Sequence, residues 1–335
     1  MPELGDTERA RGLAALRDRF DRALAAWLGD DRDVVILDYP NHDNVGDSLI
    51  WLGTRDSLRR LGVRVAYATS NEYLRPELVD RLAGLPVLFH GGGNFGDMWP
   101  ATHTTRLEMI RRFPDRRVLL LPQSVHFEAP DGDRETVRTL TGHPDLTLFV
   151  RDEPSLSWAT AAGVRAELVP DAAFATEPRR LPRPRGTGAV AVWRSDKEAR
   201  PGQELGPAAA GLTRTDWPED LAPARRAFMA AMRLHVLLRA PRGVRRAAVL
   251  ACDLMAAREL RRGIALLADA PVLVTDRLHG AVLGLMTGRT VCRVDNTYGK
   301  LAAVLDLWWP GEPAIATAAT RAEAEAWAVG RAGAA

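Results

Sequence analysis

The chain has 335 residues, of which 46% are hydrophobic and 26% charged, and its formal net charge is +2. These values are ordinary for a soluble globular enzyme, and the length favours two domains. The arginines are scattered rather than gathered in a basic stripe, which argues against a nucleic-acid-binding protein. Cys252 and Cys292 both lie in apolar stretches, so we expect buried free thiols and neither a disulfide framework nor a zinc site.

We expect neither a targeting segment nor a membrane span in this sequence. The first thirty residues mix Arg, Asp and Glu and lack an apolar run, so no signal peptide is expected. No stretch approaches the roughly 18 apolar residues that a membrane span needs. We therefore expect a cytoplasmic protein. Lysine occurs only at positions 197 and 300, although Lys and Arg together number 45, which draws attention to both positions.

The first half of the chain alternates short apolar runs with amphipathic stretches. Residues 7–28 carry apolar side chains at helical spacing and predict an opening helix. After it we expect strands at 34–37, 63–68, 86–89, 118–121, 146–150 and 166–169, and helices at 48–61, 76–83, 104–113, 134–141 and 154–162. Strands that alternate with helices predict a doubly wound parallel sheet.

The pattern breaks from residue 170 to 188, where prolines, glycines and arginines predict an interdomain linker. Beyond it we expect strands at 189–193, 271–274 and 290–294, a loose loop at 200–211, and helices at 221–238, 244–268, 281–286, 298–307 and 317–335. The fold class is therefore α/β, with two Rossmann-like domains facing a cleft. We assign residues 1–178 to the N-terminal domain, 179–187 to the linker and 188–335 to the C-terminal domain, whose last helix can cross back onto the first domain.

The most informative stretch is Thr275-Asp276-Arg277-Leu278-His279-Gly280, which lies between an apolar strand and a helix. It places polar groups at the carboxyl edge of a parallel sheet, where open α/β folds bind ligands. Arg277 offers a planar fork for a carboxylate or phosphate, and His279 offers a proton near neutral pH. The helix N-terminus adds free backbone N–H groups. We predict a cleft around this turn that binds an anionic substrate.

A second polar turn, Asn44-Val45-Gly46-Asp47, also separates a strand from a helix. Gly46 permits a tight turn and close approach of the backbone. Asp47 either caps the helix or faces the cleft, where it would bind a sugar hydroxyl or orient a base. The preceding Asn41, His42 and Asp43 add more polar side chains than a simple connection requires.

The segment Gly91-x-Gly93-x-x-Gly96 has the spacing of a dinucleotide-binding fingerprint. Pro100 follows too soon for the helix that this fingerprint demands, and the next strand does not end in an acidic residue. We therefore do not favour a nicotinamide site. The expected structure is a glycine-rich turn in which Gly92, Gly93 and Asn94 expose backbone N–H groups to a ligand.

Other strand ends also carry polar side chains. Gln123, Ser124 and His126 follow the strand at 118–121, and Arg151 follows the strand at 146–150. The alternative for Arg151 is a surface ion pair with Asp152. Such a concentration of polar groups at strand ends predicts one shared binding cleft.

Two further cations come from the second domain. Arg194 follows the strand at 189–193, where a solvated charged run is the alternative. Lys300 lies near the start of a helix, where its charge opposes the helix dipole, so an anion there is favoured slightly over an ordinary surface lysine.

In their order along the chain, these motifs resemble the polysaccharide pyruvyl transferase family. The similarity extends over about residues 38–306. The matching segments are Asn44–Asp47, Gly91–Asp97, Leu121–Ser124, Val150–Asp152, Pro170–Asp171, Arg194 with Asp196 and Glu198, and Thr275–Gly280.

The resemblance implies a glycosyltransferase-B-like fold, phosphoenolpyruvate as donor, and a sugar of a bacterial envelope or secreted polysaccharide as acceptor. The product would be a pyruvate ketal. The family's donor-contacting Arg and His correspond to Arg277 and His279. Its other site residues correspond to Asp47, Arg151, Lys300, Arg194 and His126. We hypothesise that His279 is the general acid and that Asp47 orients or deprotonates the acceptor. This scheme requires no metal and no cofactor besides the donor.

Two other functions remain open. A nucleotide-sugar glycosyltransferase of the same fold would need a carboxylate for the ribose, for which Glu198 or Asp295 could serve. A non-catalytic carbohydrate-binding protein is the other. The sequence also leaves open whether the acceptor is lipid-linked or polymeric, and the oligomeric state. Arginine-rich stretches at 179–185 and 239–246 would suit peripheral contact with a membrane, or form solvated loops.

Overall fold

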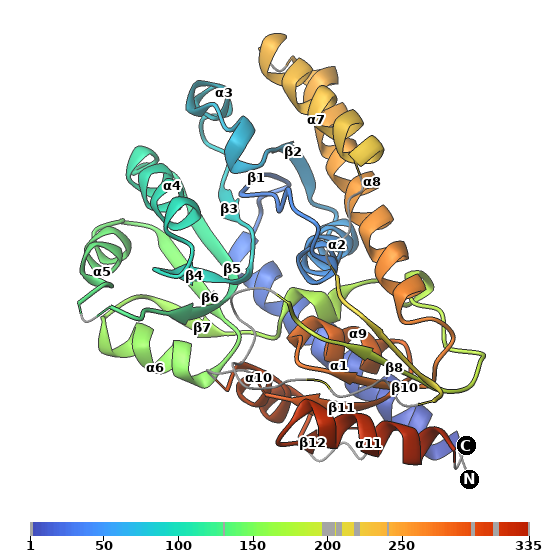
Figure 1. Ribbon diagram of the computed structural model, residues 1–335. Helices are drawn as coiled ribbons and strands as arrows, with labels where there is room; N and C mark the ends of the chain where they lie inside the picture. Colours follow the sequence, from blue (N-terminus) through green and yellow to red (C-terminus); the bar gives the residue numbers. More distant parts are fainter. Residues whose placement is uncertain are drawn as a thin grey trace.

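The computed structural model describes residues 3–129, 131–195, 205, 210–217, 222–239, 241–295, 299–310 and 315–333. Two parallel β-sheets with helices packed around them make up this part of the chain (Figure 1). The predicted α/β class is confirmed. Most of the loop expected at 200–211 falls outside the described residues, as do Asp196, Lys197, Glu198 and Tyr298.

The first sheet is formed by residues 33–168. Its strands run in the order β2-β1-β3-β5-β6-β7, and β4 pairs with β5. The strands are β1 (Asp33–Leu37), β2 (Arg64–Ala68), β3 (Val87–Phe89), β4 (Gly92–Gly96), β5 (Val118–His126), β6 (Leu146–Val150) and β7 (Ala166–Leu168). The helices around it are α1 (Glu3–Leu28), α2 (Val45–Arg60), α3 (Pro76–Asp80), α4 (Pro100–Arg112), α5 (Arg134–Thr141) and α6 (Glu153–Ala161).

The second sheet follows the order β12-β11-β10-β8-β9. Its strands are β8 (Ala189–Val192), β9 (Leu212–Thr215), β10 (Val272–Thr275), β11 (Thr290–Val294) and β12 (Ile315–Ala318). Its helices are α7 (Ala222–Leu237), α8 (Arg242–Leu266), α9 (Leu278–Met286), α10 (Lys300–Trp308) and α11 (Arg321–Ala332). The edge strands β9 and β12 were not expected, because an exposed threonine, Thr213 in β9 and Thr317 in β12, interrupts the apolar residues of each.

Both sheets are wound in the same way. In each, the second strand lies on one side of the first strand and all later strands lie on the other. The direction of winding therefore reverses between β1 and β3 and again between β8 and β10. Ligands of open α/β sheets bind outside the carboxyl ends of the strands at such a reversal. The topology thus marks one position on each sheet for a site.

The apolar side chains form three layers. The outer face of the first sheet packs against α3 to α6, and the outer face of the second packs against α11. A continuous central cluster joins the inner faces of both sheets and includes Ile36, Leu119, Val190 and Leu273. Because both faces of each sheet are covered, the central strands read as uninterrupted apolar runs. The buried free thiols of Cys252 and Cys292 confirm that prediction.

Helix α1 connects the two sheets, whereas α11 does not. The ring of Trp309 packs against Gly12 of α1, and the guanidinium of Arg19 lies 4.6 Å from the ring centre of Trp308. Helix α11 instead buries Ala324 and Ala328 under β8 to β12. The expected return of the last helix to the first domain is therefore not seen, because its small buried residues fit closely against its own sheet.

The segment between the sheets is partly buried. It contains the short 3-10 helices η2 (Ala172–Ala175) and η3 (Pro178–Arg180), and the side chains of η2 are buried. A Cβ atom at Gly53 would lie 1.8 Å from the carbonyl oxygen of Ala172, so this glycine lets α2 rest directly on η2. The domain boundaries around residues 179–187 stay a prediction.

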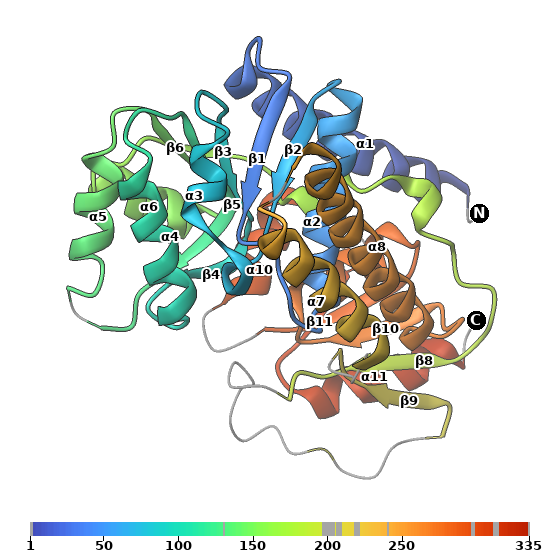
Figure 2. The same ribbon diagram turned by 90° about the horizontal axis from the view of Figure 1, so that it is seen from above.

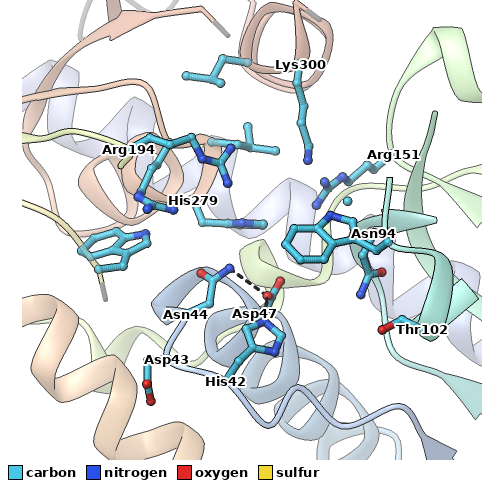
Figure 3. A pocket seen from close by; sticks show the side chains of 16 residues that line it. His42, Asp43, Asn44, Asp47, Asn94, Thr102, Arg151, Arg194, His279 and Lys300 are labelled. Carbon is cyan, nitrogen blue, oxygen red and sulfur yellow. Dashed lines mark hydrogen bonds and ion pairs between the residues drawn. The ribbon is translucent and has the colours of Figure 1, made fainter. Parts of the chain in front are cut away.

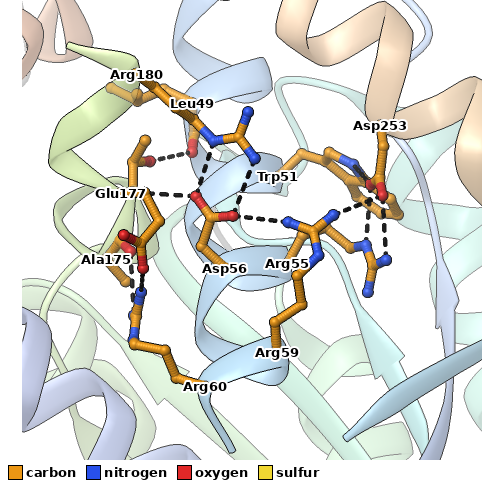
Figure 4. Close-up of polar contacts among 11 residues, drawn as sticks. Leu49, Trp51, Arg55, Asp56, Arg59, Arg60, Ala175, Glu177, Arg180 and Asp253 are labelled. Carbon is orange, nitrogen blue, oxygen red and sulfur yellow. Dashed lines mark hydrogen bonds and ion pairs between the residues drawn. The ribbon is translucent and has the colours of Figure 1, made fainter. Parts of the chain in front are cut away.

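Helix α2 is tied to its neighbours by two carboxylates (Figure 4). Asp253 of α8 accepts hydrogen bonds from Trp51, Arg55 and Arg59 of α2. Asp56 of α2 accepts from the side chain of Arg180 in η3. Seen from above, α7 and α8 form an antiparallel pair beside α2 and β2 (Figure 2). Among the described residues, no helix is both long and apolar enough to cross a lipid bilayer.

Candidate active site

A cavity of about 500 Å³ lies where the two winding reversals meet (Figure 3). The turn after β1, strand β4 and the end of β6 line one side, and the ends of β8 and β10 with the start of α10 line the other. The predicted site residues that line it are Asn44, Asp47, Gly93, Asn94, Arg151, Arg194, Arg277, Leu278, His279 and Lys300. The structure thus brings together most of the residues that the motifs singled out.

The first turn of α2 presents a carboxylate to this cavity. Asn44 caps the helix by accepting from the backbone N–H of Gly46 at 2.9 Å, so α2 begins at Val45, earlier than expected. Asp47 is therefore not the cap. Its Oδ2 atom lies 2.6 Å from Nε2 of His42 and accepts from Nδ2 of Asn44 at 2.9 Å. The carboxylate is thus held at the cavity wall by two neighbouring side chains.

The pair of Asp47 and His42 is electrostatically coupled. Burial alone would raise the pKa of Asp47, but the hydrogen bond and charge of His42 outweigh it and hold this pKa well below its usual value. Burial would lower the pKa of His42, but Asp47 outweighs it and raises this pKa above that of an ordinary histidine. The two side chains together form a unit that stabilises a proton on the imidazole.

His279 belongs to a second histidine–carboxylate pair. Its Nε2 atom lies 3.2 Å from Oδ2 of Asp171, and the same oxygen accepts from Nη1 of Arg151 at 2.5 Å. Asp171 is buried at the start of η2, where it also accepts from the backbone of Ala173. Burial opposes ionisation, but the charges of His279 and Arg151 outweigh it and hold the pKa of Asp171 well below its usual value. Asp171 therefore remains an anion that orients both partners.

Arg151 is a fully buried cation that also lines the cavity. Its Nε atom donates to Ser124 at 2.8 Å, and its carbonyl oxygen accepts from the indole of Trp308 at 2.8 Å. Its Nη2 atom is buried and has no hydrogen-bond partner among the described residues. Asp152 caps α6 instead of pairing with Arg151, so the surface ion-pair alternative is wrong. A buried donor left unsatisfied is costly unless a ligand supplies the acceptor.

Gly93 explains how two cations can share this wall. A Cβ atom at residue 93 would lie 1.9 Å from Nζ of Lys300 and 2.9 Å from Nη2 of Arg151. Only glycine leaves room for both groups beside the backbone. Lys300 also begins α10, where the positive end of the helix dipole adds to its charge. Positive groups that converge in this way are suited to a phosphate or carboxylate.

Arg277 and Arg194 line the opposite part of the cavity. Nε of Arg277 donates to Asp216 at 2.5 Å, and this ion pair outweighs burial and lowers the pKa of Asp216. The backbone N–H of Arg194 donates to Asp276 at 2.8 Å, and Asp276 is also bound by Arg321. Arg194 is therefore positioned by Asp276. The rest of the charged run after it lies outside the described residues.

Gly46 touches the catalytic candidate His279. A Cβ atom at Gly46 would lie 2.6 Å from Nδ1 of His279. This glycine is needed for close approach between α2 and α9, not for an unusual turn.

The glycine-rich segment is a strand rather than the expected turn. Residues 92–96 form β4, which pairs with β5. Gly96 has φ of +134°, and a Cβ atom there would lie 1.7 Å from the carbonyl oxygen of His126. The glycines therefore let β4 press against β5. Gly92, also at φ +134°, lies behind the cavity wall with its added Cβ position 3.5 Å from Asp47.

Strand β5 runs on to His126, so the predicted polar residues after it lie within the strand. Gln123 is buried and donates to the carbonyl oxygen of His90 at 2.7 Å, away from the main cavity. Ser124 and His126 line a smaller adjoining cavity of about 110 Å³, which shares Gly93 and Lys300 with the main one. These three residues therefore lie behind or beside the cavity that contains His279.

Several residues of the cavity were not singled out from the sequence. His42 and Asp43 were seen only as part of a polar turn, and Asp171 only as part of a motif. Trp99 and Trp217 also line the cavity, but neither lies in any recognised motif. Trp99 is 39% exposed and Trp217 is buried. Among the described residues, no group of three or more His, Cys, Asp or Glu side chains is placed to hold a metal ion.

Comparisons with known proteins identify the family of the chain. A sequence model described as polysaccharide pyruvyl transferase matches residues 44–298, which include Asn44 to Asp47 and Thr275 to Gly280. EpsO of Bacillus subtilis (strain 168), provisionally named a pyruvyl transferase, is 25% identical, with 84% of this chain and 87% of that protein covered. Pyruvyl transferase 1 of Schizosaccharomyces pombe is 29% identical, with 84% and 70% covered.

A solved structure shares the fold. The crystal structure of a functionally uncharacterized Klebsiella pneumoniae protein superposes with a TM-score of 0.59 at 17% identity, covering 91% of this chain and 99% of that one. This likeness supports the arrangement of elements and says nothing of the reaction. The family match covers most of the chain and includes both motif turns of the cavity. The chain therefore belongs to the polysaccharide pyruvyl transferase family.

Proposed function

We propose that this protein transfers the pyruvyl group of phosphoenolpyruvate onto two hydroxyls of one polysaccharide sugar, forming a pyruvate ketal. The observation that carries the proposal is the convergence of Arg151, Lys300, Arg277 and His279 on one cavity. We also infer a glycosyltransferase-B-like architecture. Its support is that two parallel sheets of the same strand order border that cavity at their winding reversals.

The donor carries two anionic groups, a phosphate and a carboxylate, and the cavity offers two sets of cations. The phosphate would lie against Lys300, the backbone of Gly93 and the unsatisfied Nη2 of Arg151. The carboxylate would face Arg277 and Arg194 on the opposite wall. Charge-assisted hydrogen bonds from such groups are stronger than neutral ones and fix the donor's orientation. This placement sets the enol carbons between the two walls, near His279.

The reaction begins with a proton from His279 to the methylene carbon of the donor. The double bond supplies the electron pair for the new C–H bond, and the adjacent carbon becomes cationic. One sugar hydroxyl attacks that carbon and loses its proton to a base. The second hydroxyl then forms the other C–O bond, phosphate leaves with the old C–O electron pair, and the second hydroxyl's proton leaves on phosphate. Asp171 stabilises the charged imidazole of His279 before the first transfer.

The base is better supplied by His42 than by Asp47. A carboxylate whose pKa lies far below its usual value is a weak proton acceptor, and Asp47 is held in that state. His42, with its raised pKa, is a stronger base than an ordinary histidine whenever it is neutral. Asp47 would then orient His42 and stabilise the imidazolium that forms, in the manner of a catalytic triad.

Asp295, one of the two candidate ribose-binding carboxylates of a nucleotide-sugar glycosyltransferase, has another role in this structure. The carboxylate of Asp295 accepts from the backbone N–H groups of Leu301 at 3.1 Å and Ala302 at 3.0 Å. It thus serves the N-terminus of α10 rather than facing a ribose. Glu198, the other candidate, lies outside the described residues.

Isothermal titration with phosphoenolpyruvate tests the proposal. We expect saturable binding that Lys300→Ala weakens at least about tenfold, because a hydrogen bond to a charged group contributes about 1.5–3 kcal/mol. Arg134→Ala, which alters an exposed side chain of α5 in an ion pair with Asp131, is the matched control and should bind normally. Saturable binding of a nucleoside diphosphate sugar, with none of phosphoenolpyruvate, would refute the proposal.

A further inference from the structure

The α7–α8 hairpin carries a group of solvent-exposed leucines. Among the described residues, the large apolar side chains that are well exposed are Trp99 of the cavity and five leucines of this hairpin. The leucines are Leu234, Leu237 and Leu238 at the end of α7 and Leu250 and Leu254 on α8, with exposed fractions of 52%, 76%, 50%, 56% and 58%. An apolar group of this kind marks an interaction surface.

These leucines are not misplaced core residues. Helix α7 has its own buried face, made by Phe228, Met232 and His235. Leu234, Leu237 and Leu238 are spaced by three and four residues and therefore share one outward face. On α8 the buried positions Val249 and Cys252 alternate with the exposed Leu250 and Leu254. The hairpin thus has two apolar surfaces: one packs against the core, and the other is exposed to solvent.

The same hairpin is strongly cationic. Between residues 221 and 252 the sequence contains no Asp or Glu, although the whole chain has a formal net charge of only +2. The arginines in this stretch are Arg225, Arg226, Arg233, Arg239, Arg242, Arg245 and Arg246. Arg233, Arg239, Arg242 and Arg246 are exposed near the leucines.

The hairpin is fixed to the active-site side of the molecule. Its base is tied to α2 through Asp253 (Figure 4). Arg225 of α7 donates to the carboxylate of Asp43 at 2.8 Å and to the carbonyl oxygen of Asn41 at 2.7 Å, in the turn that lines the cavity. The leucines and arginines at the far end therefore keep a set position relative to that turn.

We propose that the end of the α7–α8 hairpin docks on an anionic lipid bilayer. The leucines would enter the interfacial layer, and the arginines around them would contact lipid phosphates. Apolar and cationic side chains on one helical surface are the two components that bind such interfaces. Charge favours this occupant over a second copy of the chain, because two such hairpins would bring like charges together. The inference goes beyond the proposed function and does not depend on it.

Vesicle co-sedimentation at low salt tests the docking. The full chain is mixed with phosphatidylcholine vesicles that contain about one-third phosphatidylglycerol, and separately with pure phosphatidylcholine vesicles. We expect binding to the anionic vesicles alone. Arg242→Glu with Arg246→Glu should reduce the partition coefficient at least about tenfold. Leu237→Ser with Leu238→Ser should also reduce it, without any change in charge.

The matched control reverses two exposed arginines of α5 that have the same spacing, Arg134→Glu with Arg138→Glu, and should bind like the unaltered chain. Circular dichroism confirms that each variant folds. Three results would overturn the proposal: no binding to anionic vesicles, equal loss in the control, or binding that the leucine variant leaves unchanged. Sedimentation equilibrium tests the alternative of a dimer. If the unaltered chain forms a concentration-dependent dimer and the leucine variant does not, the surface binds a second copy of the chain instead.

Discussion

Gly46 and His279 are in direct contact where helices α2 and α9 meet beside the cavity. Gly46 lies in the first turn of α2 beside the first sheet, and His279 lies in the first turn of α9 beside the second. An added Cβ atom at residue 46 would lie 2.6 Å from Nδ1, 2.7 Å from Cβ and 2.8 Å from Cγ of His279. The position of the imidazole is therefore set by the absence of a side chain on the opposing helix.

Gly46→Ala should displace His279 and lower kcat by about 100-fold or more, because small misplacements of a catalytic group are costly. Alanine is the better helix former, so local helix propensity would not itself reduce stability. Gly330→Ala in α11, where nothing lies within 4 Å of the added Cβ, is the matched control. Unchanged turnover of Gly46→Ala in a phosphate-release assay would contradict the catalytic placement of His279.

His42 should govern the rise of activity with pH. Its pKa is raised by Asp47 above the usual value of 6.5, so as a base it becomes neutral, and active, only as pH rises above that value. We expect kcat/KM to increase with pH through this range. His42→Asn should lower kcat by about 10²–10⁴-fold and remove this limb of the profile. A limb that persists unchanged in His42→Asn would assign the base to another group.

His90 should make stability depend on pH. Both ring nitrogens are buried without a hydrogen-bond partner among the described residues, and burial lowers the pKa of His90 to about 4. As pH falls, His90 becomes protonated near pH 6.5 in the unfolded chain but only near pH 4 in the folded chain. The contribution to stability is thus present above pH 6.5 and is lost as pH falls toward 4.

Between pH 7 and pH 5, this loss amounts to about 2 kcal/mol of unfolding free energy. His90→Phe should shrink the measured drop by about that amount in urea titrations at the two pH values. The pKa of His103 is also lowered to about 4, so His103 still contributes to the fall in unfolding free energy in this variant. If His90→Phe shows the full drop, the histidine is not buried as a neutral group.

Trp99 should contribute to binding of the acceptor sugar. It is the exposed aromatic side chain at the cavity, and sugar rings pack their apolar faces against such groups. Trp99→Ala should raise KM for the acceptor about tenfold and leave the affinity for phosphoenolpyruvate nearly unchanged. Trp99→Phe should restore most of the loss. A change confined to donor affinity would place Trp99 at the other substrate.

The sequence was informative wherever local pattern carries the structure. Strands such as β6 are mainly apolar and helices such as α5 have periodic apolar residues, and their expected bounds agree with the structure. Arg277 and His279 could be placed at the cavity because the carboxyl ends of parallel strands share one edge. Their roles in the reaction stay predictions.

The sequence was less informative where contacts between residues far apart in the chain determine the structure. Asp171 meets His279 from 108 residues away, and no local pattern encodes that pairing. Asn44 and Asp47 are equally good helix caps, so propensity could not fix where α2 begins. The glycines of β4 have low strand propensity, but packing against β5 overrides it.

The position of α1 bears on how the protein folds during synthesis. Its contacts with Trp308 and Trp309 join residues near opposite ends of the described chain. The ribosome makes α1 long before those tryptophans exist, so the contacts of Gly12 and Arg19 with them form only after the rest of the described chain has emerged. Contacts of such long sequence separation slow folding and leave hydrophobic surface open to aggregation in the interval. Expression at lower temperature or with a chaperone should therefore raise the yield of folded protein.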